Sequence, residues 1–153
     1  MEVERKFLVS ELPELGGVES VRIEQGYLAL ADSGGAEVRL RRRGEKLTLT
    51  VKGGAGEVRV EEEIALAPNP FESLWPLTEG RRVVKRRHLI GLGELTAELD
   101  LYEGRLEGLA TVEVEFATKP QADRFQAPVW FGREVTGDQR FLNRSLATRG
   151  RPE

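Results

Sequence analysis

Cysteine is absent from this chain of 153 residues, and histidine occurs once, as His88. Disulfides, thiolate nucleophiles and zinc–thiolate sites are therefore excluded. A single histidine also excludes a metal centre built from several histidines. No apolar run approaches the roughly 20 residues that a membrane-spanning helix needs, and the charged start at residues 1–6 is not typical of a signal peptide. We therefore expect a cytoplasmic protein without a membrane segment.

An excess of charge of one sign is also lacking. Charged residues make up 32% of the chain, yet the formal net charge is only −3. This mildly acidic balance argues against a general partner for nucleic acid or an anionic membrane. The length suits one domain, which we place at residues 1–150, with a loose tail at residues 151–153. One small core cannot bury so many charges unpaired, so their placement is the question to answer.

Apolar and polar residues alternate along much of the chain, which indicates strands with one apolar and one polar face. The clearest runs lie at residues 37–43, 47–52, 58–64, 97–102 and 111–116. Less regular runs at residues 2–9, 21–31 and 82–90 bring the set to about eight strands. Glycine-containing turns between the runs, such as Gly44-Glu45 and Glu103-Gly104, predict antiparallel hairpins.

Helices are expected to be few and short. Residues 70–79 form a weak candidate that Pro76 interrupts, and residues 120–126 begin with a proline. The best candidate is residues 138–149, with Asp138 as N-cap and Gly150 as the stop. The expected fold is therefore mainly β, of the α+β kind, with a C-terminal helix.

The polar face of the predicted strands is dominated by charge, and the charges segregate by strand. The basic members are Lys6, Arg39, Arg41, Lys52, Arg59, Lys85 and Arg87. The acidic members are Glu2, Glu4, Glu61, Glu63, Glu98, Asp100, Glu113 and Glu115. Two interpretations compete at this point. The charges form cross-strand ion pairs on a solvated face, each worth about 0–1 kcal/mol, or they line the wet interior of a closed barrel that holds an anion and metal ions.

Acidic pairs at i, i+2 spacing support the second interpretation. Glu113 and Glu115 are one example, and this spacing puts two carboxylates on the same strand face, about 7 Å apart. Pairs that converge from several strands suit a hard cation such as Mg²⁺ or Mn²⁺. Carboxylates for a metal beside arginine and lysine for an anion are the groups that phosphoryl chemistry uses.

The start of the chain, Glu2-Val3-Glu4-Arg5-Lys6, resembles the Glu-x-Glu-x-Lys signature of the CYTH domain, which belongs to the triphosphate tunnel metalloenzymes. The similarity extends over nearly the whole chain. Further matching segments, in the order of the family, are Gln25–Leu28, Val38–Arg41, Leu49–Lys52, Lys85–Arg87, Glu98–Asp100, Val112–Glu115 and Glu134–Asp138 with Asn143.

This resemblance implies an eight-stranded antiparallel closed β-barrel tunnel that binds a triphosphate with Mg²⁺ or Mn²⁺. It implies metal ligation by Glu2, Glu4, Asp100, Glu113 and Glu115. It implies that phosphate oxygens are held by Lys6, Arg39, Arg41, Lys52, Lys85 and Arg87. Arg59, Glu61 and Glu63 are implied as further tunnel residues, with Glu61 or Glu63 orienting water or a second metal. The C-terminal helix is expected near one mouth of the tunnel.

The resulting hypothesis is metal-dependent hydrolysis of inorganic triphosphate to pyrophosphate and phosphate. Lys6 either positions a phosphate or, if its pKa is lowered, takes a proton. The alternatives are hydrolysis of an organic triphosphate such as thiamine triphosphate or a nucleotide, an adenylate cyclase, a non-catalytic binder of polyphosphate or nucleotide, and a plain β-protein with a charged outer face. The outward apolar positions leave room for a homodimer, although covering helices explain them equally well.

Overall fold

The fold is built around one antiparallel sheet. The computed structural model describes residues 3–30, 35–55 and 58–152, apart from the side chains of residues 55, 58 and 59. Within this part the sheet has nine strands, which are β1 (Val3–Val9), β2 (Glu19–Ala29), β3 (Ala36–Arg43), β4 (Lys46–Ala55), β5 (Val58–Ala65), β6 (Arg82–Leu92), β7 (Leu95–Tyr102), β8 (Ala110–Phe116) and β9 (Phe131–Glu134). The helical segments are α1 (Pro68–Leu74), η1 (Trp75–Thr78), η2 (Gly104–Leu106), α2 (Lys119–Arg124), η3 (Gln139–Phe141) and α3 (Asn143–Arg149).

Tight hairpins connect several neighbouring strands, as the glycine pattern predicts. In the β3–β4 hairpin Arg43 pairs with Lys46, so the turn consists of Gly44 and Glu45 alone. Gly44 has a φ of 58°, in the left-handed region that a residue without Cβ occupies at no steric cost. The turn chemistry therefore holds β3 and β4 in one register, and that register decides which side chains share a face.

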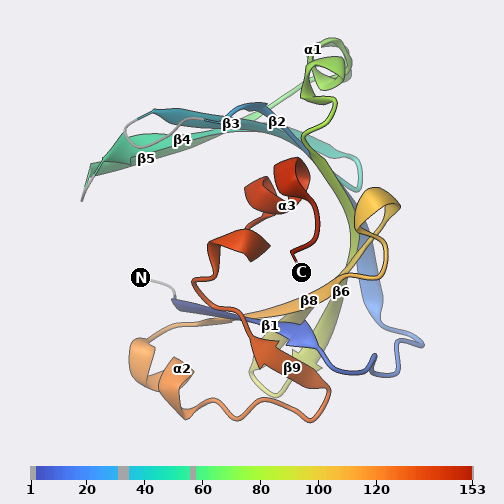
Figure 1. Cartoon of the computed structure of the whole chain (residues 1–153), viewed down its shortest axis with the longest axis vertical. Helices are drawn as coiled ribbons and strands as arrows, with labels where there is room; N and C mark the ends of the chain where they lie inside the picture. The colour runs from blue at the N-terminus through green and yellow to red at the C-terminus, as the bar shows by residue number, and fades with distance from the viewer. Residues whose placement is uncertain (1–2, 31–34, 56–57, 153) are drawn as a thin grey trace.

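The strands run in the order β5-β4-β3-β2-β6-β7-β8-β1-β9 and curl into a C-shaped sheet (Figure 1). We call β2 to β5 the upper wall and β1, β7, β8 and β9 the lower wall, with β6 between them. The mainly β, antiparallel class is confirmed. The predicted count of eight strands and the closed barrel need correction, because β9 adds a ninth strand and, among the described residues, β5 and β9 remain unpaired edges.

The C-terminal segment of η3 and α3 occupies the concave side, between the walls (Figure 1). The Phe141 carbonyl accepts a hydrogen bond of 2.7 Å from Lys6 Nζ on β1. On the other wall, Arg144 Nη1 lies 3.7 Å from Glu37 Oε1 on β3. In addition to the strand pairing through β6, side chains and a helix therefore connect the two walls across the concave side.

The edge strand β9 was not predicted, because its four residues are too few to show alternation. Tertiary contacts hold it against β1. The Arg5 guanidinium donates to both carboxylate oxygens of Glu134, at 2.9 and 2.8 Å, and also to the Ala122 carbonyl at 2.8 Å. One outward-facing arginine thus connects β1, β9 and α2.

Apolar side chains gather in three clusters. On the outer side of the lower wall the buried members are Phe7, Ala97, Leu99, Val112, Val114, Phe116, Ala122 and Phe131. On the outer side of the upper wall they are Leu40, Leu47 and Phe71. The third cluster joins η3 and α3 to the concave side and contains Tyr27, Val83, Tyr102, Leu106, Leu109, Val135, Phe141, Leu146 and Ala147. Short helices therefore cover apolar strand positions, which leaves the remaining concave surface to charged residues.

The three predicted helical segments are present, with one difference in continuity, whereas η2 was not predicted. Residues 138–149 form η3 and α3 rather than one helix, because Leu142 between them has an extended conformation with φ −67° and ψ 143°. Asp138 caps η3 by accepting a hydrogen bond from the Arg140 amide. Gly150 ends α3 with a φ of 78°. Pro76 lies in η1, where the predicted helix at 70–79 changes from α to 3-10 geometry.

Candidate active site

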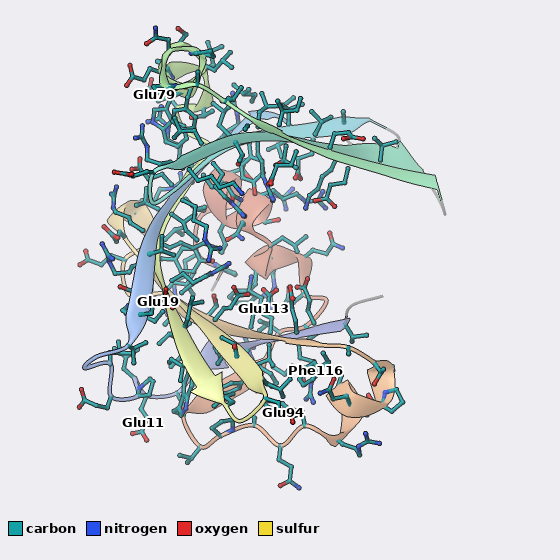
Figure 2. The ribbon with its side chains drawn as sticks, turned by 180° about the vertical axis from the view of Figure 1, so that it is seen from behind. Glu11, Glu19, Glu79, Glu94, Glu113 and Phe116 are labelled. Atoms are coloured by element: carbon teal, nitrogen blue, oxygen red, sulfur yellow. The ribbon has the colours of Figure 1, made fainter. Side chains whose placement is uncertain are left out.

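The charged positions of the strands face the concave side of the sheet. Figure 2 shows Glu113 on the inner side of the lower wall and Phe116, from the same strand, on the outer side. In the strand register Lys6 lies opposite Glu113, and Arg87 lies opposite Asp100. The structure therefore brings the predicted residues of β1, β6, β7 and β8 onto one surface, which favours the tunnel interpretation over a solvated outer face.

Three carboxylates from two neighbouring strands form an acidic cluster. Oxygens of Glu4, Glu113 and Glu115 all lie within 4.8 Å of one another. The pKa of Glu4 is raised to about 8, first by its hydrogen bond with Glu113, then by burial and by the negative charges of Glu113 and Glu115. At neutral pH the Glu4–Glu113 pair therefore retains a proton, because like charges at this spacing cannot all ionise.

The acidic cluster fits a divalent cation. Carboxylate oxygens are the ligands that hard cations such as Mg²⁺ and Mn²⁺ prefer. A site that keeps a proton to relieve repulsion would exchange it for a cation, which relieves the repulsion more completely. Glu4, Glu113 and Glu115 would hold such an ion. Glu2, predicted for the same role, lies outside the described residues, so its assignment stays a prediction.

Asp100 lies apart from the acidic cluster and pairs with two cations. Its carboxylate lies 2.8 Å from Lys85 Nζ, and it accepts hydrogen bonds of 2.8 and 3.0 Å from Arg87. Burial alone would raise the pKa of Asp100, but Lys85 and Arg87 outweigh it and lower the pKa. Arg87 also reaches Glu98 at 3.2 Å. The predicted role of Asp100 as a metal ligand is untested and stays a prediction beside these ion pairs.

Lys6 projects from β1 toward the C-terminal segment, where its ammonium group donates to the Phe141 carbonyl. Its pKa is lowered by burial, which the nearby charges of Glu113 and Asp100 oppose only in part. Lys85 is fully buried, and burial likewise lowers its pKa against the attraction of Asp100. Both lysines are thus easier to deprotonate than an exposed lysine.

The upper wall contributes two arginines. Arg41 Nε donates to Gln25 Oε1 at 2.8 Å, and Gln25 Nε2 in turn donates to the Tyr27 hydroxyl at 2.7 Å. The pKa of Arg41 is lowered to about 10, first by burial and then by the positive charge of Arg39. Arg39 Nε is buried without a hydrogen-bond partner. A buried N–H without an acceptor costs about 1–3 kcal/mol, so this group is suited to an incoming anion.

The predicted residues at the β4–β5 edge lie in a more open setting. Lys52 Nζ is 3.7 Å from Glu61 Oε1, and both side chains are largely exposed. The Thr50 hydroxyl donates a long hydrogen bond of 3.4 Å to Glu63. The side chain of Arg59 lies outside the described part of the chain. Exposed pairs of this kind contribute little to stability, and the predicted roles of these residues stay predictions.

Sequence reasoning assigned no site role to several polar residues that the structure places among the charges, namely Gln25, Tyr27, Tyr102, Thr111 and Asn143. All but Asn143 are buried. Tyr27 shares its strand face with Gln25 because one residue separates them. The period-two alternation of a strand could therefore have placed both residues on the same face. Asn143 reaches Tyr102 from α3, a contact between distant segments that no local pattern encodes.

The concave surface thus combines an acidic cluster for a cation with lysines and arginines for an anion. An arrangement of this kind binds a metal–phosphate complex and offsets the charge that develops during phosphoryl transfer. Among the helices that the structure describes, none has the length and apolar character that crossing a membrane requires.

Comparison with known proteins agrees with this chemistry. An inorganic triphosphatase of Nitrosomonas europaea is 45% identical over 148 residues, which are 95% of this chain and 96% of that protein. An inorganic triphosphatase of Acetivibrio thermocellus is 35% identical, and the match covers 95% of this chain and 92% of that protein.

Solved structures show the same fold. A crystal structure of an inorganic triphosphatase superposes with a TM-score of 0.82 at 42% identity, covering 99% of this chain and 97% of that one. A protein of Pyrococcus horikoshii shares the fold alone, with a TM-score of 0.52 at 22% identity over 80% of this chain and 82% of that one. Residues 1–141 match the family model of the CYTH domain. Because this match spans most of the chain and includes the charged concave surface, the chain belongs to the CYTH domain family.

Proposed function

We propose that the protein hydrolyses inorganic triphosphate to pyrophosphate and phosphate with Mg²⁺ or Mn²⁺ as cofactor. One observation carries this proposal: the acidic cluster and the cations of both walls share a single concave surface. Glu113 of the cluster lies directly opposite Lys6 in the strand register, so a cation site and an anion site are neighbours. The inorganic triphosphatases of Nitrosomonas europaea and Acetivibrio thermocellus support this choice of substrate.

Cations on the upper wall and on β6 would bind the substrate. Arg39 and Arg41 approach it from the upper wall, and Lys85 and Arg87 approach it from β6. The unpartnered Nε of Arg39 would donate to a phosphate oxygen, which removes the cost of a buried, unpaired donor. Substrate and protein therefore complement one another in charge, and the substrate bridges the two walls.

Hydrolysis requires a water molecule to attack the terminal phosphorus in line with the leaving group. We assign Lys6, in its neutral amine form, to accept a proton from this water, because burial lowers its pKa and makes that form easier to reach. The bond from the terminal phosphorus to the bridging oxygen then breaks, and pyrophosphate leaves with the bonding electrons. A divalent ion held by Glu4, Glu113 and Glu115 would offset the negative charge of the phosphate oxygens.

Other parts of the hypothesis stand on the sequence and the family resemblance alone. Among the site residues these are the roles of Glu2, Lys52, Arg59, Glu61, Glu63 and Asp100. For the whole protein, the cytoplasmic location, the lack of a nucleic-acid partner and a homodimer remain predictions of the same kind.

Phosphate release tests the function directly. Inorganic triphosphate is offered with Mg²⁺ or Mn²⁺ beside ATP, thiamine triphosphate and pyrophosphate, and a chelator is added to one arm. We expect metal-dependent release from inorganic triphosphate that exceeds release from every other substrate. A preference for ATP or thiamine triphosphate, or equal release in the presence of chelator, would contradict the proposal.

A matched pair of variants tests the metal site within the same assay. Glu115→Gln removes one carboxylate of the acidic cluster, and Glu94→Gln makes the same change in the exposed turn between β6 and β7 (Figure 2). At limiting Mg²⁺ we expect Glu115→Gln to lose about tenfold or more in activity, with partial recovery at high Mg²⁺. Glu94→Gln should have the activity of the parent protein. Equal activity of the two variants at limiting Mg²⁺ would contradict the assignment of Glu115 to the metal.

A further inference from the structure

We propose that Asn143, from the C-terminal helix α3, is a positioning residue for hydrolysis because it holds the Lys85 ammonium group in place. This inference rests on the proposed function of the same site. The Asn143 Oδ1 atom accepts a hydrogen bond of 2.8 Å from the Tyr102 hydroxyl and a longer one of 3.5 Å from Lys85 Nζ. One carboxamide oxygen thus joins β6 and β7 to the C-terminal segment.

The two donors depend on this oxygen because both are buried. Lys85 is 0% exposed and Tyr102 is 4% exposed, so water does not provide a ready alternative. A lysine ammonium has three donors and no acceptor, and Asp100 Oδ2, at 2.8 Å, receives one of them. Asn143 supplies a second acceptor from another direction. Two fixed acceptors define the direction of the remaining N–H donor, which the proposed function assigns to a phosphate oxygen.

Asn143 is not needed to cap its own helix. It is the first residue of α3, and the N-cap position belongs to Leu142, which makes no side-chain capping bond. The packing of α3 comes from Leu146 and Ala147, both fully buried in the cluster that contains Tyr102. The carboxamide is therefore directed to the strands rather than to the helix backbone.

The same short segment also contacts the other lysine of the site. Two residues before Asn143, the Phe141 carbonyl accepts the hydrogen bond from Lys6 Nζ at 2.7 Å. Residues 141–143 thus hold Lys6 and Lys85 from one side. The C-terminal segment is part of the substrate site and does more than cover the end of the sheet.

Two variants of Asn143 separate its acceptor atom from its volume. Asn143→Leu keeps the size but removes the acceptor, whereas Asn143→Asp keeps the Oδ1 acceptor. Because positioning of Lys85 serves substrate binding, we expect Asn143→Leu to raise KM for inorganic triphosphate about tenfold with a smaller change in kcat. Asn143→Asp should retain most of the parent KM. Thr148→Ala is the control on the same helix, because among the described residues its hydroxyl bonds to the Arg144 and Ser145 carbonyls of α3 itself.

A double-mutant cycle with Lys85→Met distinguishes positioning from general support of the fold. If Asn143 acts through Lys85, then Asn143→Leu should change KM less than twofold once Lys85 is absent. Additive effects of the two changes would overturn the inference. So would a KM within twofold of the parent value in Asn143→Leu itself, in a variant whose thermal unfolding shows an intact fold.

A readout without turnover keeps this inference separate from the proposed function. The ¹⁵N NMR signal of the Lys85 ammonium group reports its hydrogen bonding in the chain without substrate. We expect that signal to shift in Asn143→Leu and to stay in place in Thr148→Ala. If the Lys85 signal does not move in Asn143→Leu, the inference is overturned. If the parent protein releases no phosphate, the proposed function is contradicted instead, and the NMR result still decides whether Asn143 positions Lys85.

Discussion

At the scale of single residues, Glu4 links the charge of the site to stability. Its pKa is about 8 in the folded metal-free chain, against an ordinary value of 4.5. Between these values the folded state retains a proton that the unfolded state has released. The free energy of unfolding therefore falls as the pH rises from about 4.5 to about 8, and it levels off above that range.

The first prediction concerns the variant Glu4→Gln, which removes this titration. In the presence of a chelator, urea unfolding of the parent protein should show decreasing stability from pH 5 to pH 8. The same series on Glu4→Gln should be flatter, and the variant should be the more stable protein at pH 8. Glu94→Gln, altered in the exposed turn, should follow the parent curve. Parallel slopes for all three proteins would mean that Glu4 and Glu113 do not share a proton.

Residue patterns predicted this cluster in part. Glu113 and Glu115 share a strand face by their i, i+2 spacing, and Glu4 shares a face with Lys6 for the same reason. The spacing could not show that β1 pairs with β8, which puts Glu4 opposite Glu115. Strand pairing between residues more than a hundred positions apart depends on the whole fold, and so does the repulsion that raises the pKa of Glu4.

At the scale of elements, α3 connects the apolar core to the charged surface. Leu146 is fully buried in the cluster with Tyr27, Val83 and Tyr102, whereas Leu142, just before the helix, is 39% exposed. Burial of Leu146 therefore anchors the helix that carries Asn143. Loss of this anchor should affect both stability and the position of the site residues.

The second prediction compares two leucine truncations in this segment. Leu146→Ala should lower the free energy of unfolding by about 2–5 kcal/mol, because it leaves a cavity in the core. Leu142→Ala should lie within about 0.5 kcal/mol of the parent protein, as is usual for surface changes. Urea unfolding followed by circular dichroism measures both. Similar values for the two variants would show that α3 is not anchored through Leu146.

Strand β9 and the break between η3 and α3 are two features that the local sequence pattern did not predict. The four residues of β9 have no long alternating pattern, and β9 is held by Arg5, Glu134 and its pairing with β1. Leu142 interrupts a sequence that reads as one helix from residue 138, because its extended backbone turns the chain into the concave space. In both cases contacts with distant residues outweighed local propensity.

At the scale of the whole molecule, two charged walls that are joined through β6 face one another across the concave side. Inward-facing cations such as Arg39, Arg41 and Arg87 repel one another, and the positive charges of Arg39 and Arg87 both lower the pKa of Arg41. A polyanion that contacts both walls would offset this repulsion. Ligand binding should therefore stabilise the protein as a whole, because it adds connections between the walls.

The third prediction is a rise in melting temperature with inorganic triphosphate and Mg²⁺ in combination. Ligand at 100 times its Kd should contribute about 2.7 kcal/mol to stability, and each component alone at the same concentration should contribute less. Arg39→Ala should reduce the shift because it removes the unpartnered donor. An equal shift in Arg39→Ala would contradict its assignment to the substrate.

Alternation and turn chemistry were sufficient to predict the antiparallel strands, the charged face and most of the residues on it. Period-two alternation is a local property, so residues such as Arg39, Arg41 and Glu113 could be assigned to one strand face directly. The hairpin at Gly44 likewise depends on neighbouring residues and their backbone preferences alone. These features are therefore available from the order of amino acids without knowledge of distant contacts.

The tertiary structure decided the order of the strands, the open shape of the sheet and the meeting of α3 with the lysines of the site. Asp100 illustrates the difference, because its place on a strand face was predictable but its ion pairs with Lys85 and Arg87 depend on the pairing of β6 with β7. Asn143 reaches Tyr102 only after the C-terminal segment enters the concave space. Such contacts arise from burial and electrostatics summed over distant segments, which no single stretch of sequence contains.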